Sequence, residues 1–148
     1  MADMDVNIGR DTLLALAAIA WADGKMDPKE ASGIRAAARQ LALSPEDSRA
    51  LEDALGRRTG IEEVETIRMS RLTRLFTYAV AHWVAQLDGA LSADEESTLG
   101  LLGDRLGLSV VARERAKTVA LAQAGDAAYD LVKLRAKLSS GLSQISDE

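Results

Sequence analysis

The sequence predicts an all-α fold: a single-domain helical bundle of seven or eight helices with an internal pseudo-two-fold duplication. The first observation is size and composition, because 148 residues suffice for one domain with a core, and the 47% of apolar residues are mostly Ala and Leu. The second is the absence of strand signals. Only two prolines interrupt the helix-forming composition, and no stretch alternates apolar and polar residues for long enough to favour a strand. The third is a motif that occurs twice.

This motif is Asp-Gly-x-apolar-(Asp/Ser)-x-x-Glu, which starts at Asp23 and again, 65 positions later, at Asp88. A Leu-x-Leu-Ser segment follows each copy, at 41–44 and at 106–109. An internal repeat of this kind indicates a duplicated structural unit. Two copies predict helical hairpins, over about 10–55 and 70–125, that fold against each other. We expect a helical domain over 10–139, with a flexible leader at 1–9 and a flexible tail at 140–148.

The first helix is predicted over 10–22, where residues are apolar on nearly every face, so that neighbours must enclose it. Gly24 ends it, since a C-terminal cap needs the left-handed conformation that glycine adopts readily. Asp27 then caps the second helix, with Pro28 at the first helical position and Glu30 completing a capping box. That helix runs to the first Leu-x-Leu-Ser segment.

Ser44 begins the third helix by the same logic. Thr59 and Glu62 have the spacing of a further capping box, and they predict a short helix over about 60–68. A longer helix is predicted over 70–87, and the whole of 60–87 could instead be continuous. This helix has the widest apolar face of the chain, so we expect it at the centre, against the first helix.

In the second half, Ser92 and Glu95 form the capping box of the sixth helix. Ser109 begins the seventh helix, and Asp126 caps an eighth that ends near Leu138. The serines and acidic residues that follow are typical of a frayed tail.

Composition and charge exclude several functions. A formal charge of −5 disfavours nonspecific nucleic-acid binding, and the lack of cysteine removes disulfides, thiolate metal sites and Cys nucleophiles. The apolar run at 13–22 resembles a signal peptide but follows an acidic segment, and it is too short to cross a bilayer. We therefore expect a cytoplasmic protein with no direct membrane insertion.

The acidic residues of the two Asp-Gly turns are the candidate metal ligands. Asp23 and Asp88 end helices, where a carboxylate meets the negative end of the helix dipole and costs about 0.3–1 kcal/mol. Either an Asx-type hydrogen bond or a bound cation offsets this cost. A standard EF-hand is excluded because Ile19 and Trp21 would occupy its first ligand positions. An oxygen-only site for calcium or magnesium stays open. Its ligands would be Asp23, Asp27, Glu30, Asp88 and Glu95. In the competing interpretation, these residues are only helix caps.

Other side chains offer less chemistry. Trp21 and Trp83 are expected in the core, and the single histidine, His82, is expected to be an ordinary residue on the flank of its helix; the alternative is a pocket for a small molecule or substrate near these three residues. The many arginines are expected to form ion pairs on solvated faces, and Arg57-Arg58 with the arginines at 68, 71 and 74 could instead form an anion-binding patch. No nucleophile with an adjacent base is recognisable.

The duplicated pattern resembles the TerB-like domain, which takes its name from tellurite resistance proteins. The resemblance rests on Ala20-Trp21-Ala22-Asp23-Gly24 and Ala85-Gln86-Leu87-Asp88-Gly89, with their following Asp/Ser-x-x-Glu and Leu-x-Leu-Ser segments, and covers about 10–125. It implies an all-helical, roughly two-fold fold, a stress-response role and divalent cations at surface acids; it implies no catalytic activity. Ser92 replaces the aspartate of the first copy, which weakens the second site. We expect a non-enzymatic module that binds an unknown protein partner, or a homodimer, with a weakly bound divalent cation.

Overall fold

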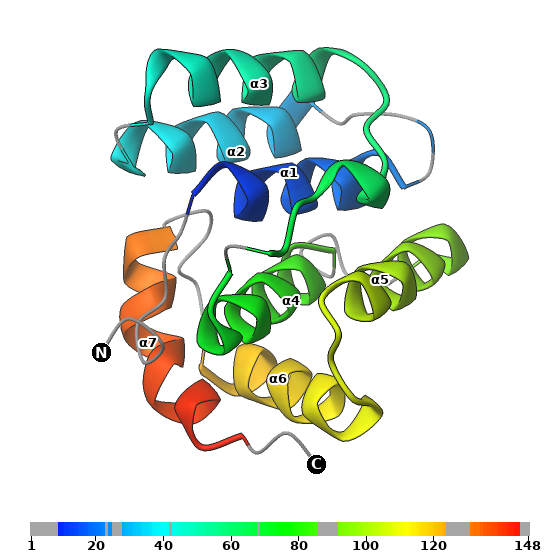
Figure 1. Ribbon diagram of the computed structural model, residues 1–148, viewed down its shortest axis with the longest axis vertical. Coiled ribbons are helices and arrows are strands. Elements are labelled where there is room, and N and C mark those ends of the chain that lie inside the picture. Colours follow the sequence, from blue (N-terminus) through cyan, green and yellow to red (C-terminus); the bar gives the residue numbers. More distant parts are fainter. Residues whose placement is uncertain are drawn as a thin grey trace.

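The protein is helical throughout the part that the structure, a computed structural model, describes: residues 9–22, 24, 28–41, 43–67, 69–85, 92–123 and 131–145. These residues form seven α-helices and one 3-10 helix joined by short connections, which confirms the predicted all-α class (Figure 1). In chain order the elements are α1 (Arg10–Ala20), α2 (Pro28–Leu41), α3 (Pro45–Gly56), η2 (Ile61–Glu63), α4 (Arg71–Ala85), α5 (Ala93–Arg105), α6 (Val110–Gln123) and α7 (Leu131–Ser143).

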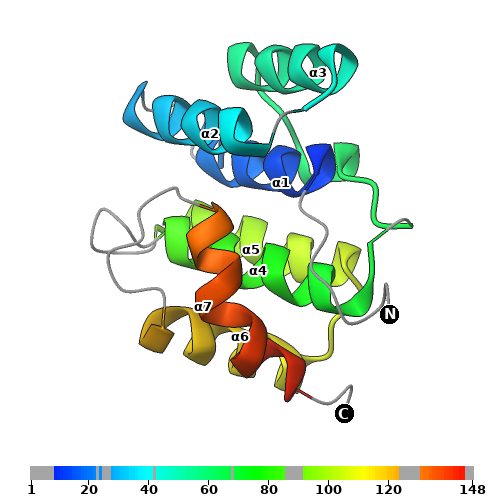
Figure 2. The same ribbon diagram turned by 90° about the vertical axis from the view of Figure 1, so that its left-hand side faces the viewer.

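The helices lie in two groups that meet where α1 packs on α4. Helices α1, α2 and α3 stack in one group, and α4, α5, α6 and α7 form the other (Figures 1 and 2). Helix α4 contacts α1, α5, α6 and α7, which confirms its predicted central position against the first helix. None of the helices in the described ranges combines the length and the apolar character that crossing a bilayer requires.

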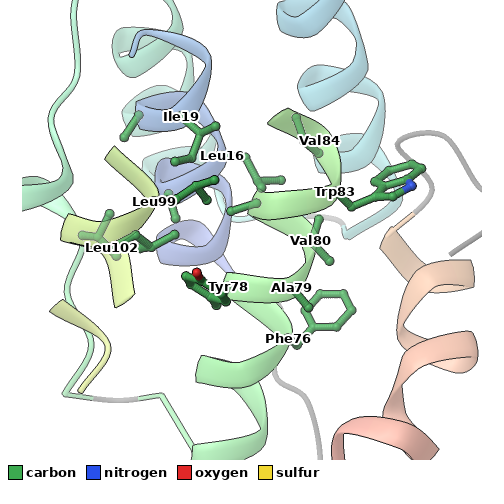
Figure 3. Close-up of a cluster of buried hydrophobic side chains, with 14 of the residues drawn as sticks. Leu16, Ile19, Phe76, Tyr78, Ala79, Val80, Trp83, Val84, Leu99 and Leu102 are labelled. Atoms are coloured by element: carbon green, nitrogen blue, oxygen red, sulfur yellow. The ribbon is translucent and has the colours of Figure 1, made fainter. Parts of the chain in front are cut away.

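The core is built around these two helices. Every residue from Thr12 to Ala20 is buried, as is every residue from Leu75 to Ala85. Figure 3 shows side chains of α1, α4 and α5 gathered in one apolar cluster, with Leu16 of α1 and Leu99 of α5 among them. A helix that is apolar on all faces can be stable only when it is enclosed, and the packing of α1 satisfies this condition.

Serine caps set most of the predicted helix starts. The hydroxyl oxygen of Ser44 accepts from the amide of Asp47 at 3.1 Å, and that of Ser109 accepts from the amide of Ala112 at 3.1 Å. Each bond satisfies one of the amides that the first turn of a helix leaves free. The predicted starts of α3 and α6 are confirmed.

The connection between α3 and α4 differs from the prediction. Among the described residues of this connection, only Ile61–Glu63 are helical, and Glu63 rather than Glu62 accepts from the capping amide, that of Gly60, at 3.3 Å. The hydroxyl of Thr59 instead donates to the carbonyl of Ala54 at 2.8 Å. The sequence spacing misplaced this box by one residue because the buried Thr59 is used to close the end of α3.

The last helix ends later than predicted. Helix α7 (Leu131–Ser143) continues beyond the predicted end near Leu138, while its predicted cap, Asp126, lies outside the described residues. Leu142 is fully buried and Ile145 is 5% exposed, while the carbonyl of Ile145 accepts a hydrogen bond from Arg71. The end of α7 packs on the domain because two apolar side chains follow its polar serines at the spacing of a buried face.

Candidate functional site

Gly24 is the residue of the first Asp-Gly turn whose backbone the structure describes, and it has the predicted conformation. Gly24 has a φ of 87°, in the left-handed region, and its amide donates to the carbonyl of Trp21 at 2.8 Å. The predicted ligands Asp23 and Asp27 lie outside the described residues. Glu30 lies in the first turn of α2, and its side chain also falls outside the description. The cation site at this turn stays a prediction.

The second turn is described only from Ser92 onward, so Asp88 lies outside the described residues. Here Glu95 forms the predicted capping box: its Oε1 accepts from the amide of Ser92 at 3.0 Å, and its own amide donates to the Ser92 hydroxyl at 3.1 Å. The structural role of Glu95 is confirmed. A cation at this carboxylate would be left with Oε2, because Oε1 already accepts the backbone hydrogen bond.

The carboxylates suit a hard cation by their chemistry, since calcium and magnesium prefer oxygen ligands. Within the described ranges, no three acidic, histidine or cysteine side chains come close enough together to hold a metal ion. Of the five predicted ligands, the structure therefore places one side chain, that of Glu95, and assigns it to the helix cap.

The aromatic residues proposed for an alternative pocket are engaged in packing. The indole Nε1 of Trp21 donates to the carbonyl of Ala54 at 2.9 Å, which ties the end of α1 to α3. Trp83 and His82 are buried on α4, and the imidazole lies against the ring of Tyr78 with 6.2 Å between ring centroids. Burial raises the pKa of the Tyr78 hydroxyl, because a phenolate loses solvation there. Nothing in this arrangement favours the pocket of the alternative interpretation.

Arg57, one of the arginines expected to form ion pairs, is part of a small network. The guanidinium of Arg57 bonds to Asp53 at 2.7 Å and to Glu63 at 2.6 and 3.0 Å. Hydrogen bonds from Arg57 hold the pKa of the Glu63 carboxyl below its usual range, and those to Glu63 and Asp53 raise the pKa of Arg57. Asp53 and Glu63 thus occupy donors of Arg57 and balance its charge, which leaves it poorly suited to the predicted anion patch.

Other arginines bind backbone carbonyls, a role that sequence reasoning missed. Arg74 donates to the carbonyls of Met69, Leu106 and Thr66 at 3.3, 3.2 and 3.0 Å. Arg105 donates to the carbonyl of Val64 at 2.8 Å. These contacts fasten the connection before α4 to the end of α5. They leave the predicted anion patch without Arg74, one of its proposed members.

A groove between α2 and α3 is a further candidate site that the sequence did not indicate. It has a volume of about 330 Å³. Its apolar lining comes from Ala38, Leu43 and Leu51, and the polar lining comes from Arg35, Arg39, Ser48 and Glu52. A second cavity of about 360 Å³ lies between α6 and the end of α7, and Arg115, Val119 and Ile145 are among its lining residues.

Comparison with known proteins finds a family match for the first part of the chain. Residues 1–53 match the family model described as tellurite resistance protein TerB. Over these residues the chain is similar to that family. No curated protein and no solved structure matches it. The TerB-like segment includes α1, the first Asp-Gly turn, α2 and most of α3, and with them all the residues that line the α2–α3 groove.

Proposed function

We propose that this TerB-like chain is a non-enzymatic module of the tellurite-resistance type that acts by binding a protein partner. The match of residues 1–53 to the TerB family is the observation that carries this proposal. The proposal includes weak binding of a divalent cation, calcium or magnesium, at the acidic Asp-Gly turns, and it assigns the protein to the cytoplasm.

The partner surface that we propose is the start of α6. Large apolar side chains are exposed at Val110, the first residue of this helix, which is 72% exposed, and at Val111. The first turns of α3 and α5 carry acidic residues, which the positive end of the helix dipole favours. A valine pair gives neither a cap nor a favourable charge at such a position, so helix formation does not account for it. Covering apolar side chains of this kind with a partner is favourable.

Photo-crosslinking tests the partner proposal. A crosslinking residue would be placed at Val110 and, as a control, at Glu46, which is exposed in the first turn of α3. We expect a discrete crosslinked species from position 110 only, in cells that express the chain. We also expect Val110→Ser/Val111→Ser, but not Glu46→Ser, to reduce tolerance to tellurite. Equal crosslinking at both positions, or none at either, contradicts the proposal.

Thermal unfolding under cation titration tests the second part. A ligand that binds only the folded state stabilises it by RT ln(1 + [L]/Kd), which is about 1.4 kcal/mol at 10 mM ion for a Kd of about 1 mM. For a domain of this size the melting temperature would rise by about 3–6 °C. The double variant Asp23→Asn/Asp88→Asn should lose this rise. An equal rise in that variant, or none in the parent chain, contradicts cation binding at these turns.

A further inference from the structure

The two helix pairs α2–α3 and α5–α6 can be compared position by position where one helix of the pair ends and the next begins. Helices α2 and α5 begin 65 residues apart, at Pro28 and Ala93, and so do α3 and α6, at Pro45 and Val110; Thr12 and Thr77 have the same separation. The hydrogen bonds at the starts of α3 and α6 correspond as well. The caps of α3 and α6 both use a serine hydroxyl that accepts from the amide three residues later at 3.1 Å.

In the α5–α6 pair, an arginine of the chain itself fills the space between the helices. Arg113 donates through Nε to the carbonyl of Leu108 at 2.8 Å, and through Nη2 to Oδ1 of Asp104 at 2.8 Å. Gly103 makes room for this side chain, because a Cβ at that position would lie 2.5 Å from Nε of Arg113. Only 20% of the Arg113 side chain is exposed.

The α2–α3 pair has different residues at the three corresponding positions, and there the groove is open. Ala38 stands at the position of Gly103, Arg39 at that of Asp104 and Ser48 at that of Arg113. The short serine cannot fill the space, and a groove of about 330 Å³ remains. The charge at its edge is also inverted, because an arginine replaces the aspartate.

The charges around the groove favour a single negative group. Arg35 and Glu52 pair with each other at 2.9 Å, so that they add no net charge. Arg39 is exposed, and it forms no ion pair with any of the described residues. One uncompensated guanidinium thus stands beside an apolar floor that includes Leu51, which is 2% exposed.

We propose that this groove binds a small aliphatic monocarboxylate. The carboxylate pairs with Arg39, whose planar guanidinium matches carboxylate geometry, and Ser48, which also lines the groove, supplies a hydroxyl donor. The aliphatic body covers the apolar lining formed by Ala38, Leu43 and Leu51. The volume lies at the lower end of the range for small-molecule sites, which suits a short chain. This site is independent of the proposed partner surface on α6 and of the Asp-Gly turns.

Titration of the full chain with hexanoate, followed by amide NMR, tests this proposal. We expect saturable shifts at Leu43, Ser48 and Leu51, whereas hexylammonium, which has the same length and the opposite charge, should produce none. Arg39→Met keeps an unbranched stem and removes the charge, and it should weaken hexanoate binding about tenfold or more. The control Arg49→Met changes another exposed arginine, outside the groove lining, and should leave the affinity unchanged.

A second pair of variants closes the groove. The triple variant Ala38→Gly/Arg39→Asp/Ser48→Arg introduces the residues of the α5–α6 pair and should abolish hexanoate binding. Ser48→Met fills the same space with a single substitution at an exposed position, so it decides the question even if the triple variant does not fold. No saturable binding of hexanoate up to about 20 mM overturns the proposal. Unchanged affinity in Arg39→Met, in Ser48→Met or in the folded triple variant also overturns it, and equal shifts with hexylammonium show adsorption without charge recognition.

Discussion

The hydroxyl oxygens of Thr12 and Thr77 lie 3.0 Å apart in the interface between α1 and α4, and both residues are buried. They are the two polar groups that meet where the apolar helices cross. Their separation in sequence, 65 residues, equals the distance between the two Asp-Gly motifs. A two-fold axis brings each residue near it into contact with its own counterpart. The pairing therefore supports the hypothesis of a duplicated helical unit, which stays a prediction.

This hydrogen bond predicts that a single substitution at either threonine lowers the free energy of unfolding more than the double substitution does. Thr12→Val leaves the Thr77 hydroxyl buried without its partner, and it should lower the free energy of unfolding by about 1–3 kcal/mol. The double variant Thr12→Val/Thr77→Val removes both hydroxyls and should recover most of this loss. Urea unfolding of the parent chain, the two single variants Thr12→Val and Thr77→Val, and the double variant gives the coupling energy. Additive losses would show that the two hydroxyls do not depend on each other.

The capping box at the start of α5 predicts that two neighbouring glutamates contribute differently to the free energy of unfolding. Glu95 accepts from the Ser92 amide, whereas Glu96 is exposed and its side chain forms no hydrogen bond or ion pair with the described residues. Glu95→Ala should therefore cost about 1 kcal/mol in metal-free buffer, and Glu96→Ala should cost little, mainly through the helix dipole. Thermal unfolding with a chelator present measures both. If the two variants are equally stable, the capping box contributes no net stability.

The Arg57–Glu63 pair predicts a pH dependence whose sign follows from the lowered pKa of Glu63. A carboxyl with a lowered folded-state pKa stabilises the fold above its unfolded value, 4.5, and this contribution disappears as pH falls through the lower folded-state value. Glu63→Gln should therefore melt below the parent chain at pH 7, and the two curves should converge on acidification below about 4.5. High salt should narrow the difference at pH 7, because both side chains are partly exposed. A constant difference across this pH range would assign the effect of the substitution to packing.

The elements that could be predicted from sequence are those set by local interactions. The starts of α3, α5 and α6 follow from serines whose hydroxyls bond three residues ahead, a pattern visible in the chain itself. The central position of α4 follows from its apolar faces.

The α2–α3 groove could not be predicted in the same way. The groove depends on the absence, between α2 and α3, of a side chain like that of Arg113, which fills the corresponding space between α5 and α6. This role of Arg113 is recognisable only from its contacts with Gly103 and Asp104 in the structure. Arginine contacts to carbonyls are equally hidden, because every residue has a carbonyl and the sequence does not say which one Arg74 reaches. The cation site depends mainly on side chains outside the described residues, so it remains a prediction from the sequence.

Substitution of Arg74 should lower the free energy of unfolding more than substitution of an exposed arginine. Its guanidinium donates to three carbonyls that join the connection before α4 to the end of α5. Arg74→Met keeps most of the apolar stem but removes these bonds, and it should cost about 1.5–3 kcal/mol. Arg58→Met, at an exposed position, is the control and should stay within about 0.5 kcal/mol of the parent chain. Urea unfolding measures both, and equal stabilities would show that water replaces the lost donors without cost.

The end of α7 predicts that removing apolar side chains beyond residue 139 destabilises the whole domain. Leu142 is fully buried, so Leu142→Ala creates a cavity and should lower the free energy of unfolding by about 2–5 kcal/mol. Gln144→Ala, at an exposed position nearby, should change it by less than about 0.5 kcal/mol. Truncation after Leu138 removes both Leu142 and Ile145, along with the carbonyl that Arg71 binds, and it should cost more than Leu142→Ala alone. Retention of the parent melting temperature in the truncated chain would show that these residues are a dispensable tail, as their sequence suggested.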